Sequence, residues 1–265
     1  MTEIIAIVNQ KGGVGKTTTA INISACLAAS GLKTLLIDAD QQGSSTIGLG
    51  LNKQQLKTTF YDFLMTDTPL DQMLKETMLA GLHILPAKSD LLGVDQKMAG
   101  LEHRETILKR RLDQKLASPS GYDFIIIDAP PNLDLLNINI MAAANRLIIP
   151  TQPEYLSLEG LANLIDTYKR IRETINNKLS ILGILITMNL SNCRLSREVS
   201  QDLRRFMGNV VFENVIPRNI RLAEAPGHAK PIIIYDPQSA GAASYLAVTR
   251  EILTRLNLKF SMPDQ

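Results

Sequence analysis

The chain of 265 residues has no tryptophan, only two cysteines and few aromatic side chains, which make up 5% of the sequence. The two cysteines, Cys26 and Cys193, form none of the closely spaced patterns that ligate metals or exchange disulfides. Cys26 falls among apolar residues at helical spacing, so we expect a buried, reduced thiol, which fits a reducing cytosol. The cysteine content therefore argues against a disulfide-stabilised secreted domain and against a cysteine-ligated metal centre.

Long apolar runs and a large excess of one charge are also missing. No apolar segment approaches the roughly 20 residues that cross a bilayer, and strand-like sequence begins at Ile4, which leaves no room for a secretory signal. The net charge is only +2, so any contact with nucleic acid must come from a local basic patch. We expect a cytoplasmic protein made of a single domain over residues 1–265.

Short apolar runs alternate with helical patterns along nearly the whole chain. The runs are rich in Ile, Leu and Val, as expected for strands that are covered on both faces of a parallel sheet. This alternation predicts an α/β fold with a doubly wound, mostly parallel sheet flanked by helices, and ligands at the carboxyl ends of the strands. Residues 50–81 are less regular, with two short helical stretches, and we interpret them as an insertion near the ligand site. The expected strands are residues 4–8, 34–37, 82–85, 124–127, 146–149 and 181–187, with a further candidate at 210–212, and the expected helices are residues 17–30, 103–116, 135–144, 157–175, 194–207 and 239–256.

A glycine-rich loop follows the first expected strand and reads Gln10-Lys11-Gly12-Gly13-Val14-Gly15-Lys16-Thr17-Thr18. Its glycines allow successive backbone N–H groups to face one concavity, and the following helix adds free N–H groups and the positive end of its dipole. Lys16 is placed to reach the β- and γ-phosphates, and the Thr17 hydroxyl is placed to ligate Mg²⁺. The loop therefore predicts nucleotide phosphate binding. The expected phosphate-binding residues are Gly12, Gly13, Val14, Gly15, Lys16, Thr17 and Thr18.

Carboxylates follow two further expected strands. Asp38 and Asp40 come directly after the second strand, and Asp128 ends the strand at residues 124–127. Beside a phosphate loop, one acid of the first pair can orient or deprotonate an attacking water, and the other can support metal and loop geometry. Asp128 can hold a metal-bound water. Taken alone, the first pair could also be a polar turn that caps the next segment.

These three motifs, in this order, resemble those of the deviant Walker A ATPases, the ParA/MinD group of P-loop NTPases. Later blocks narrow the resemblance to the ParA (Soj-like) branch, which partitions chromosomes and plasmids, and the resemblance extends from residue 4 to about residue 256. It implies a P-loop ATPase fold, ATP and Mg²⁺ as cofactors, slow intrinsic ATP hydrolysis, and a homodimer that sandwiches two ATP molecules. The blocks are residues 150–155, 159–161, 215–226, 230–232, 235–237 and 241–242.

The resemblance also implies roles for single residues. Lys11 matches the signature lysine that crosses to the partner's nucleotide, whereas Lys16 and Thr17 match the P-loop lysine and the Mg²⁺ ligand. Asp40 matches the acid that positions the hydrolytic water, and Asp128 matches the Walker B acid that acts on Mg²⁺ through water. The residues expected at the metal are thus Thr17, Asp40 and Asp128. The implied nucleotide contacts outside the loop are Pro217, Asn219 and Met188, with Glu154 facing the ribose across the dimer.

In this branch the ATP dimer binds double-stranded DNA non-specifically, and a ParB-type centromere-binding protein stimulates hydrolysis. The resemblance therefore implies both partners, and association with the nucleoid in the ATP state. The contacts would be Arg–phosphate pairs from both protomers. For Arg197 and Arg204, which share a helix with Glu198 and Asp202, a solvated mixed-charge face is the plain alternative. The candidate DNA contacts are Arg194, Arg197, Arg204, Arg205, Arg218, Arg221 and Arg250.

The sequence departs from the family pattern at two places. Gln41 stands where the family usually has proline, which would loosen the turn after Asp40 without removing a ligand. Asn192 stands where many relatives carry an arginine associated with DNA contact, although Arg194 lies two places on. The departures affect the turn and the DNA footprint rather than the ATPase itself.

Three other functions are alternatives for a chain with these motifs. A MinD-like membrane-associated positioning ATPase would dock through a C-terminal amphipathic helix, but Tyr245, Val248, Ile252 and Leu256 are more simply a core-packing face, and residues 259–265 are too short to anchor a protein. We therefore expect no stable membrane association. A nitrogenase-iron-protein-like reductase would need cluster cysteines, which residues 132–137 lack. A metabolic amidoligase would need substrate machinery that the sequence does not reveal.

Overall fold

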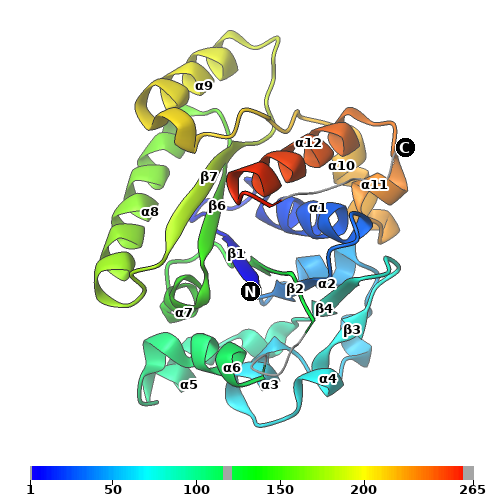
Figure 1. The fold of residues 1–265 in the computed structure, drawn as a ribbon, viewed down its shortest axis with the longest axis vertical. Helices are drawn as coiled ribbons and strands as arrows, with labels where there is room; N and C mark the ends of the chain where they lie inside the picture. Colours follow the sequence, from blue (N-terminus) through cyan, green and yellow to red (C-terminus); the bar gives the residue numbers. More distant parts are fainter. Residues whose placement is uncertain (1, 116–120, 259–265) are drawn as a thin grey trace.

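The computed structural model describes residues 2–115 and 121–258, and it is built around one seven-stranded sheet in the order β3-β4-β2-β5-β1-β6-β7 (Figure 1). All neighbouring strands pair in parallel except β3, which runs antiparallel to β4 at the edge. The predicted doubly wound, mostly parallel fold is therefore confirmed. The strands are β1 (Glu3–Ile7), β2 (Thr34–Asp38), β3 (Lys75–Glu76), β4 (Leu82–Leu85), β5 (Phe124–Asp128), β6 (Arg146–Thr151) and β7 (Ser180–Ile186).

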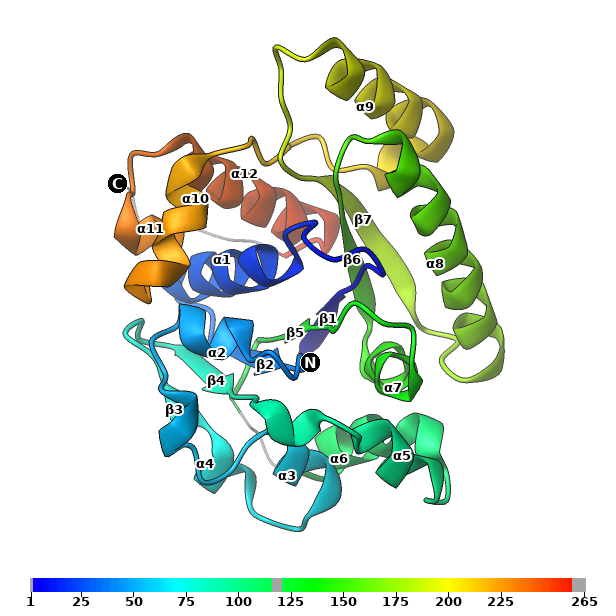
Figure 2. The same cartoon turned by 180° about the vertical axis from the view of Figure 1, so that it is seen from behind.

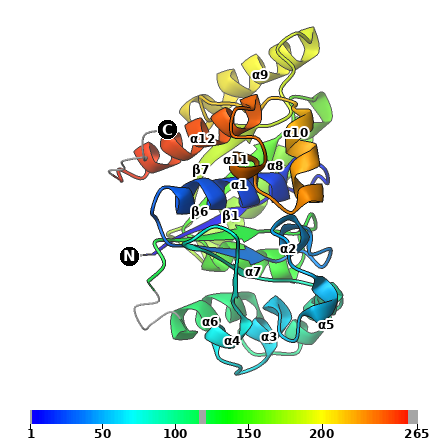
Figure 3. The same ribbon diagram turned by 90° about the vertical axis from the view of Figure 1, so that its right-hand side faces the viewer.

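Helices cover both faces of the sheet, as Figures 2 and 3 show from behind and from the side. Strand β1 explains why two layers form: Ala6 and Val8 point into one hydrophobic core, whereas Ile5 and Ile7 point into the other. Helices α1 and α12 cover the second core, and α3, α6, α7 and α8 cover the first. The α-helices are α1 (Lys16–Ala29), α2 (Ser44–Gly48), α3 (Phe60–Met65), α4 (Leu70–Met73), α5 (Val94–Ala99), α6 (Ile107–Lys115), α7 (Leu135–Ala143), α8 (Tyr155–Thr174), α9 (Arg194–Met207), α10 (Ile220–Glu224), α11 (Ile232–Tyr235) and α12 (Ala240–Arg255).

Two predictions about buried side chains are confirmed. Cys26 is buried in α1 with no disulfide, and burial raises the pKa of its thiol to about 12. On α12, Tyr245, Val248 and Ile252 are buried in the core beside α1, so this face packs inward and is not free to lie on a membrane. No helix in the described parts of the chain is both long and apolar enough to span a bilayer. The tail at residues 259–265 lies outside the described residues.

The strand proposed at residues 210–212 is wrong. A 3-10 turn occupies Gly208–Val210, and only one bridge joins Val211 to Ile184 of β7. The ladder stops there because the next backbone N–H groups, of Glu213 and Asn214, donate to the Glu251 carboxylate of α12 at 2.9 and 3.0 Å. A side chain from a distant helix thus replaces a neighbouring strand as hydrogen-bond partner.

Other differences concern short elements. The helix expected from residue 103 begins with a 3-10 turn at Arg104–Thr106 and becomes α-helical only at Ile107, and its expected end at Leu116 lies outside the described residues. The short elements α2, α5, α10, α11 and β3 carry too few residues for a periodic pattern to reveal them. Residues 50–81 do contain two short helices, α3 and α4, as expected.

Gly183 in β7 allows us to test how tightly the sheet packs against the segment that follows α9. A Cβ at this position would lie 2.3 Å from Cε2 of Phe212, which is fully buried. We expect Gly183→Ala to lower the free energy of unfolding by about 2 kcal/mol, seen as a lower Tm. The matched control is Gly160→Ala in α8, where a Cβ meets nothing within 4 Å; there we expect a small gain, because alanine favours helix. Equal melting of Gly183→Ala and wild type would contradict this packing.

Candidate nucleotide site

The glycine-rich loop connects β1 to α1 at the carboxyl edge of the sheet. Gly13 and Gly15 have φ of 74° and 88°, in the left-handed region that favours glycine. Gly15 is the N-cap of α1, and its carbonyl accepts the first helical hydrogen bond, from Thr19 N–H at 2.9 Å. The N–H groups of the first helical turn therefore have no helical acceptor and remain available to an anion.

Residues at the ends of β6 and β7 hold this loop. The Thr187 hydroxyl donates to the Val14 carbonyl at 2.8 Å, and Gln152 Nε2 donates to the Gly13 carbonyl at 3.0 Å. The sequence motifs did not identify these supports. The only available signal is their position, since both residues follow strands that end at the same edge as the loop.

The two loop lysines have different environments. Lys16 is buried, with its Nζ donating to the Lys11 carbonyl at 3.2 Å; burial lowers the pKa of its ammonium, while the charges of Asp128 and Asp40 oppose this shift. Lys11 is partly exposed, and its Nζ lies 2.7 Å from Oε2 of Glu154 and 3.3 Å from the hydroxyl of Ser157, at the start of α8. Lys11 therefore forms an ion pair within its own chain.

Asp38 and Asp128 are register partners on the neighbouring strands β2 and β5, and both are fully buried. Asp38 accepts hydrogen bonds from the N–H and hydroxyl of Thr46, at 2.8 and 2.7 Å, and from the N–H of Asp40 at 3.2 Å. Oδ2 of Asp128 accepts from the Ser45 hydroxyl at 2.8 Å. Burial raises the pKa of both carboxyl groups, and the charge of Asp38 raises that of Asp128 further.

The donor set around Asp128 fits a Mg²⁺ ion held partly through water. Its Oδ1 is buried and has no hydrogen-bond partner in the described chain, and the Thr17 hydroxyl lies near enough to lower the pKa of this carboxyl. The described residues contain no cluster of three or more His, Cys, Asp or Glu that could hold a metal ion alone. A site made from one hydroxyl, one carboxylate, phosphate oxygens and water does not need such a cluster. Asp40 lies close enough for its charge to act on Lys16.

Of the predicted nucleotide contacts outside the loop, Glu154 and Met188 follow the ends of β6 and β7, whereas Pro217 and Asn219 lie in the segment before α10. Met188 adopts the left-handed conformation, with φ of 50°, and its sulfur lies 2.8 Å from Nε2 of Gln152. A parallel bridge joins Asn189 to Pro217, and Asn219 caps α10 by accepting from Leu222 N–H at 3.3 Å. The structure thus brings Met188 close to the phosphate loop through Gln152 and pairs its segment with that of Pro217.

The candidate DNA-contacting arginines separate into paired and unpaired groups. Arg194 forms an ion pair with Glu198 at 2.7 Å, and Arg221 forms ion pairs with Glu224 at 2.9 Å and Asp236 at 3.3 Å. Arg197 donates to the Ser191 carbonyl at 3.3 Å. Arg218 and Arg250 are exposed and form no ion pair with any described residue. The contact of Arg221 with Asp236 joins two segments that sequence motifs do not show to be neighbours.

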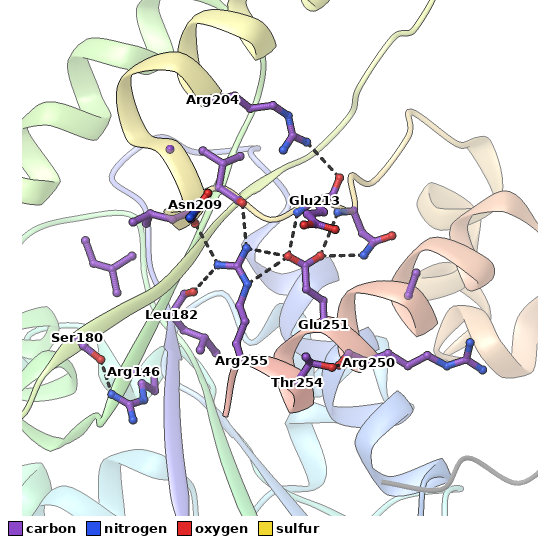
Figure 4. A pocket seen from close by; sticks show the side chains of 16 residues that line it. Arg146, Ser180, Leu182, Arg204, Asn209, Glu213, Arg250, Glu251, Thr254 and Arg255 are labelled. Carbon is purple, nitrogen blue, oxygen red and sulfur yellow. Dashed lines mark hydrogen bonds and ion pairs between the residues drawn. The ribbon is translucent and has the colours of Figure 1, made fainter. Parts of the chain in front are cut away.

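A cavity of about 1200 Å³ lies near the opposite ends of β6 and β7, next to α9 and α12 (Figure 4). At its centre, Arg255 donates to the carbonyls of Leu182 and Val211, both at 2.9 Å, and to Glu251 at 2.7 Å. These polar groups form hydrogen bonds with one another. We therefore interpret the cavity as a structural contact region between α12 and β7 and not as a ligand site. Arg204 and Arg250 line it, and Arg250 points away from the central network.

Replacing Asp128 by asparagine tests how much the ionised, buried carboxylates lower the free energy of unfolding. A raised carboxyl pKa means that the folded protein keeps a proton that the unfolded chain has lost, so ionisation near neutral pH opposes folding. We expect Asp128→Asn to raise the unfolding free energy of the nucleotide-free protein by about 1–3 kcal/mol at about pH 7.5. The gain should shrink as the pH falls toward about 4, where the unfolded carboxyl also holds its proton.

Thermal melts over this pH range provide the measurement, with Asp113→Asn on the exposed face of α6 as the control. Added Mg²⁺ should increase the stabilisation of wild type by ATP, but should add little in Asp128→Asn. A lower Tm for Asp128→Asn than for wild type at neutral pH would contradict the prediction.

Comparisons with known proteins agree with this geometry. The family model of an AAA domain matches residues 2–181. The sporulation initiation inhibitor protein Soj of Bacillus subtilis is 44% identical over 252 residues, which cover 95% of this chain and 98% of that protein. The chromosome partitioning protein ParA of Caulobacter vibrioides is 43% identical over 252 residues, covering 95% of this chain and 94% of its own.

Among solved structures, cobyrinic acid a,c-diamide synthase from Mycobacterium smegmatis, with a bound ATP analogue and magnesium, aligns with a TM-score of 0.83 and 32% identity over 100% of both chains. That protein is named as a diamide synthase, but the identity of this chain to Soj and ParA is higher over nearly the same length. These relatives and the phosphate-loop geometry lead to one assignment. The chain belongs to the ParA/Soj family of partitioning ATPases, within the ParA/MinD group of P-loop NTPases.

Proposed function

We propose that this ATPase is a DNA-partitioning switch that dimerises on ATP and Mg²⁺, binds double-stranded DNA non-specifically as the dimer, and leaves DNA after hydrolysis. The observation that carries the proposal is the phosphate loop with a second lysine, Lys11, at its surface. Lys16 is buried in its own site, whereas Lys11 is partly exposed and held only by neighbours at the start of α8. Two lysines so placed can serve two different nucleotides.

Each chain supplies most of one ATP site. The free N–H groups at the start of α1 and the Lys16 ammonium would neutralise the β- and γ-phosphates. Thr17 and, through water, Asp128 would hold Mg²⁺, which supplies electrostatic stabilisation of the charge that develops on the phosphates. Asp40 would orient the attacking water and accept its proton. Asp38 instead positions the following turn, because its oxygens are occupied by Thr46 and Asp40 N–H.

Dimerisation would move Lys11 from Glu154 to the partner's phosphates. The Lys11–Glu154 pair is exposed, with 37% and 55% of the side chains accessible, so it contributes at most about 1 kcal/mol to the free energy of unfolding. Two phosphates are a stronger attraction for an ammonium than one solvated carboxylate. Glu154 would then be free to face the ribose across the dimer.

The DNA surface would be formed around residues 189–191, beside the position of Asn192. Arg197 of α9 donates to the Ser191 carbonyl, and Arg218 N–H donates to the Asn189 carbonyl at 3.1 Å, so these two arginines flank the same segment. We favour them as phosphate contacts, together with exposed Arg250. Arg194 and Arg221 are weaker candidates because carboxylates in their own chain already pair with them. Support for a ParB-type activator that inserts an arginine-bearing segment comes from the family alone.

The proposal is tested by retention on DNA with ATP, ADP and no nucleotide. Wild type should bind only with ATP, and binding should weaken with salt by a slope of about 0.9 per phosphate contact. Lys16→Ala should lose retention, because the phosphates are no longer neutralised, and Asp40→Ala should prolong it, because hydrolysis is slowed. Equal retention with ADP and ATP would refute the switch.

Lys11→Ala separates ATP binding from dimerisation. Because Lys11 does not contribute its ammonium to its own site, affinity for ATP should change by less than about threefold. The dimer, its retention on DNA and stimulated hydrolysis should be lost, as measured by light scattering and DNA retention. Lys57→Ala, on an exposed residue, is the control. A Lys11→Ala protein that still forms an ATP dimer on DNA would refute the role in trans.

A further inference from the structure

The turn after β2 sets the orientation of the Asp40 carboxylate. Gly43 N–H donates to the Asp40 carbonyl at 2.8 Å, which closes a β-turn over residues 40–43. Gln42 N–H donates to Oδ1 of Asp40, also at 2.8 Å. The carboxylate and the turn are therefore coupled, so motion of the turn would move the side chain that the proposed mechanism places on water.

Lys53, from the segment after α2, lies along this turn. Its Nζ donates to the Gln42 carbonyl at 2.6 Å. Its stem packs against Gly43, since a Cβ at Gly43 would lie 2.7 Å from Cδ of Lys53 and 2.6 Å from the Ala87 carbonyl. Gly43 has φ of 61° and so favours glycine for a second reason. The lysine thus contacts the turn with both its stem and its ammonium group.

The segment that carries Lys53 is itself supported. The residue lies in a 3-10 turn, Lys53–Gln55, where Asn52 Oδ1 accepts from Gln54 N–H at 3.0 Å. Lys88 Nζ donates to the Leu56 carbonyl at 3.0 Å, which ties this segment to the loop after β4. The same loop reaches the turn from the other side, because Ala87 N–H donates to the Thr46 hydroxyl at 3.0 Å, and Thr46 binds Asp38.

The Lys53 contact matters because of Gln41, the residue that follows Asp40 in the turn. It occupies the second position of the turn, where proline is favoured because its fixed φ stiffens the backbone. No described residue accepts a hydrogen bond from the Gln41 N–H, so the turn has neither a proline nor a backbone bond at this position. Besides the bonds that Gly43 and Gln42 make to Asp40 within the turn, the Lys53 bond to the next carbonyl restrains the turn from another segment.

We propose that Lys53 is a positioning residue for ATP hydrolysis: it holds the turn that orients Asp40, in place of the stiffness that proline at position 41 would supply. The inference rests on the proposed role of Asp40. It also gives residues 50–81 a part in the site, since their first 3-10 turn brings the lysine to the turn after β2 while α3 and α4 pack in the core on the α6 side of the sheet.

Steady-state ATPase assays with Mg²⁺ test the proposal in Lys53→Met, with Lys53→Arg as the conservative variant and Lys57→Met as the matched control. We expect kcat of Lys53→Met to fall about three- to tenfold, because the turn loses a charged hydrogen bond, with KM for ATP and Tm nearly unchanged. Lys53→Arg should retain most of the activity. Adding Gln41→Pro to Lys53→Met should restore kcat, because proline stiffens the same turn.

A double-mutant cycle with Asp40→Ala separates this inference from the proposed function. If Lys53 acts through Asp40, Lys53→Met should lower kcat no further once Asp40 is alanine. If Lys53→Met lowers kcat by the same factor in the Asp40→Ala background, the inference is overturned. It is also overturned if the Lys53→Met single variant turns over ATP as fast as wild type or faster. If Asp40→Ala itself leaves kcat unchanged, the proposed role of Asp40 fails instead.

Discussion

Two carboxylates buried side by side constrain the rest of this site. Parallel pairing of β2 with β5 places Asp38 opposite Asp128, where neither can reach bulk water. Buried ionised groups are costly unless hydrogen bonds and opposite charges compensate them. Asp38 receives this compensation from Thr46 and from the N–H of Asp40, whereas Asp128 accepts from the Ser45 hydroxyl on Oδ2 and has the Thr17 hydroxyl nearby, but its Oδ1 has no hydrogen-bond partner in the described chain.

The unsatisfied oxygen of Asp128 explains why the site favours cations. Lys16 is buried nearby, and burial lowers the pKa of its ammonium, while the charges of Asp128 and Asp40 oppose this shift. A divalent ion close to Asp128 would offset the free-energy cost of burying the ionised carboxylates. This gain in stability would add to the affinity for the ion. Ser45 and Thr46 lie in the first turn of α2, which begins directly after Gly43, and bind Asp128 and Asp38. A metal ion at Asp128 would therefore act on a carboxylate that is hydrogen-bonded to the segment following the turn after Asp40.

The sequence was sufficient for the parts of the site that are local. The loop, the acids and the helix start each follow a strand, and strands in a parallel sheet deliver their carboxyl ends to one edge, so their meeting could be predicted. Contacts between distant segments could not. Lys11 and Glu154 are 143 positions apart, Gln152 reaches Gly13 across 139, and Lys53 approaches Gln42 only because its segment folds back. The strand expected at residues 210–212 was wrong, and the pairing of Arg221 with Asp236 could not be predicted, for the same reason: the partner side chains lie on other elements.

The ion pair of Lys11 with Glu154 shows how a nucleotide-free chain can hold the Lys11 ammonium group near the surface of the phosphate loop. A lysine ammonium beside the N-terminus of α8 meets the positive end of that helix dipole, and Glu154, as the N-cap residue, offsets it. Once Lys11 leaves, Glu154 remains favourably placed, because a carboxylate at a helix N-terminus is stabilised by the same dipole. The proposed movement would therefore separate the charges of Lys11 and Glu154 without placing either charge next to a group that repels it. In the proposed dimer the cost of releasing Lys11 would be small, so the partner's phosphates, rather than the strength of the ion pair, would decide when Lys11 moves.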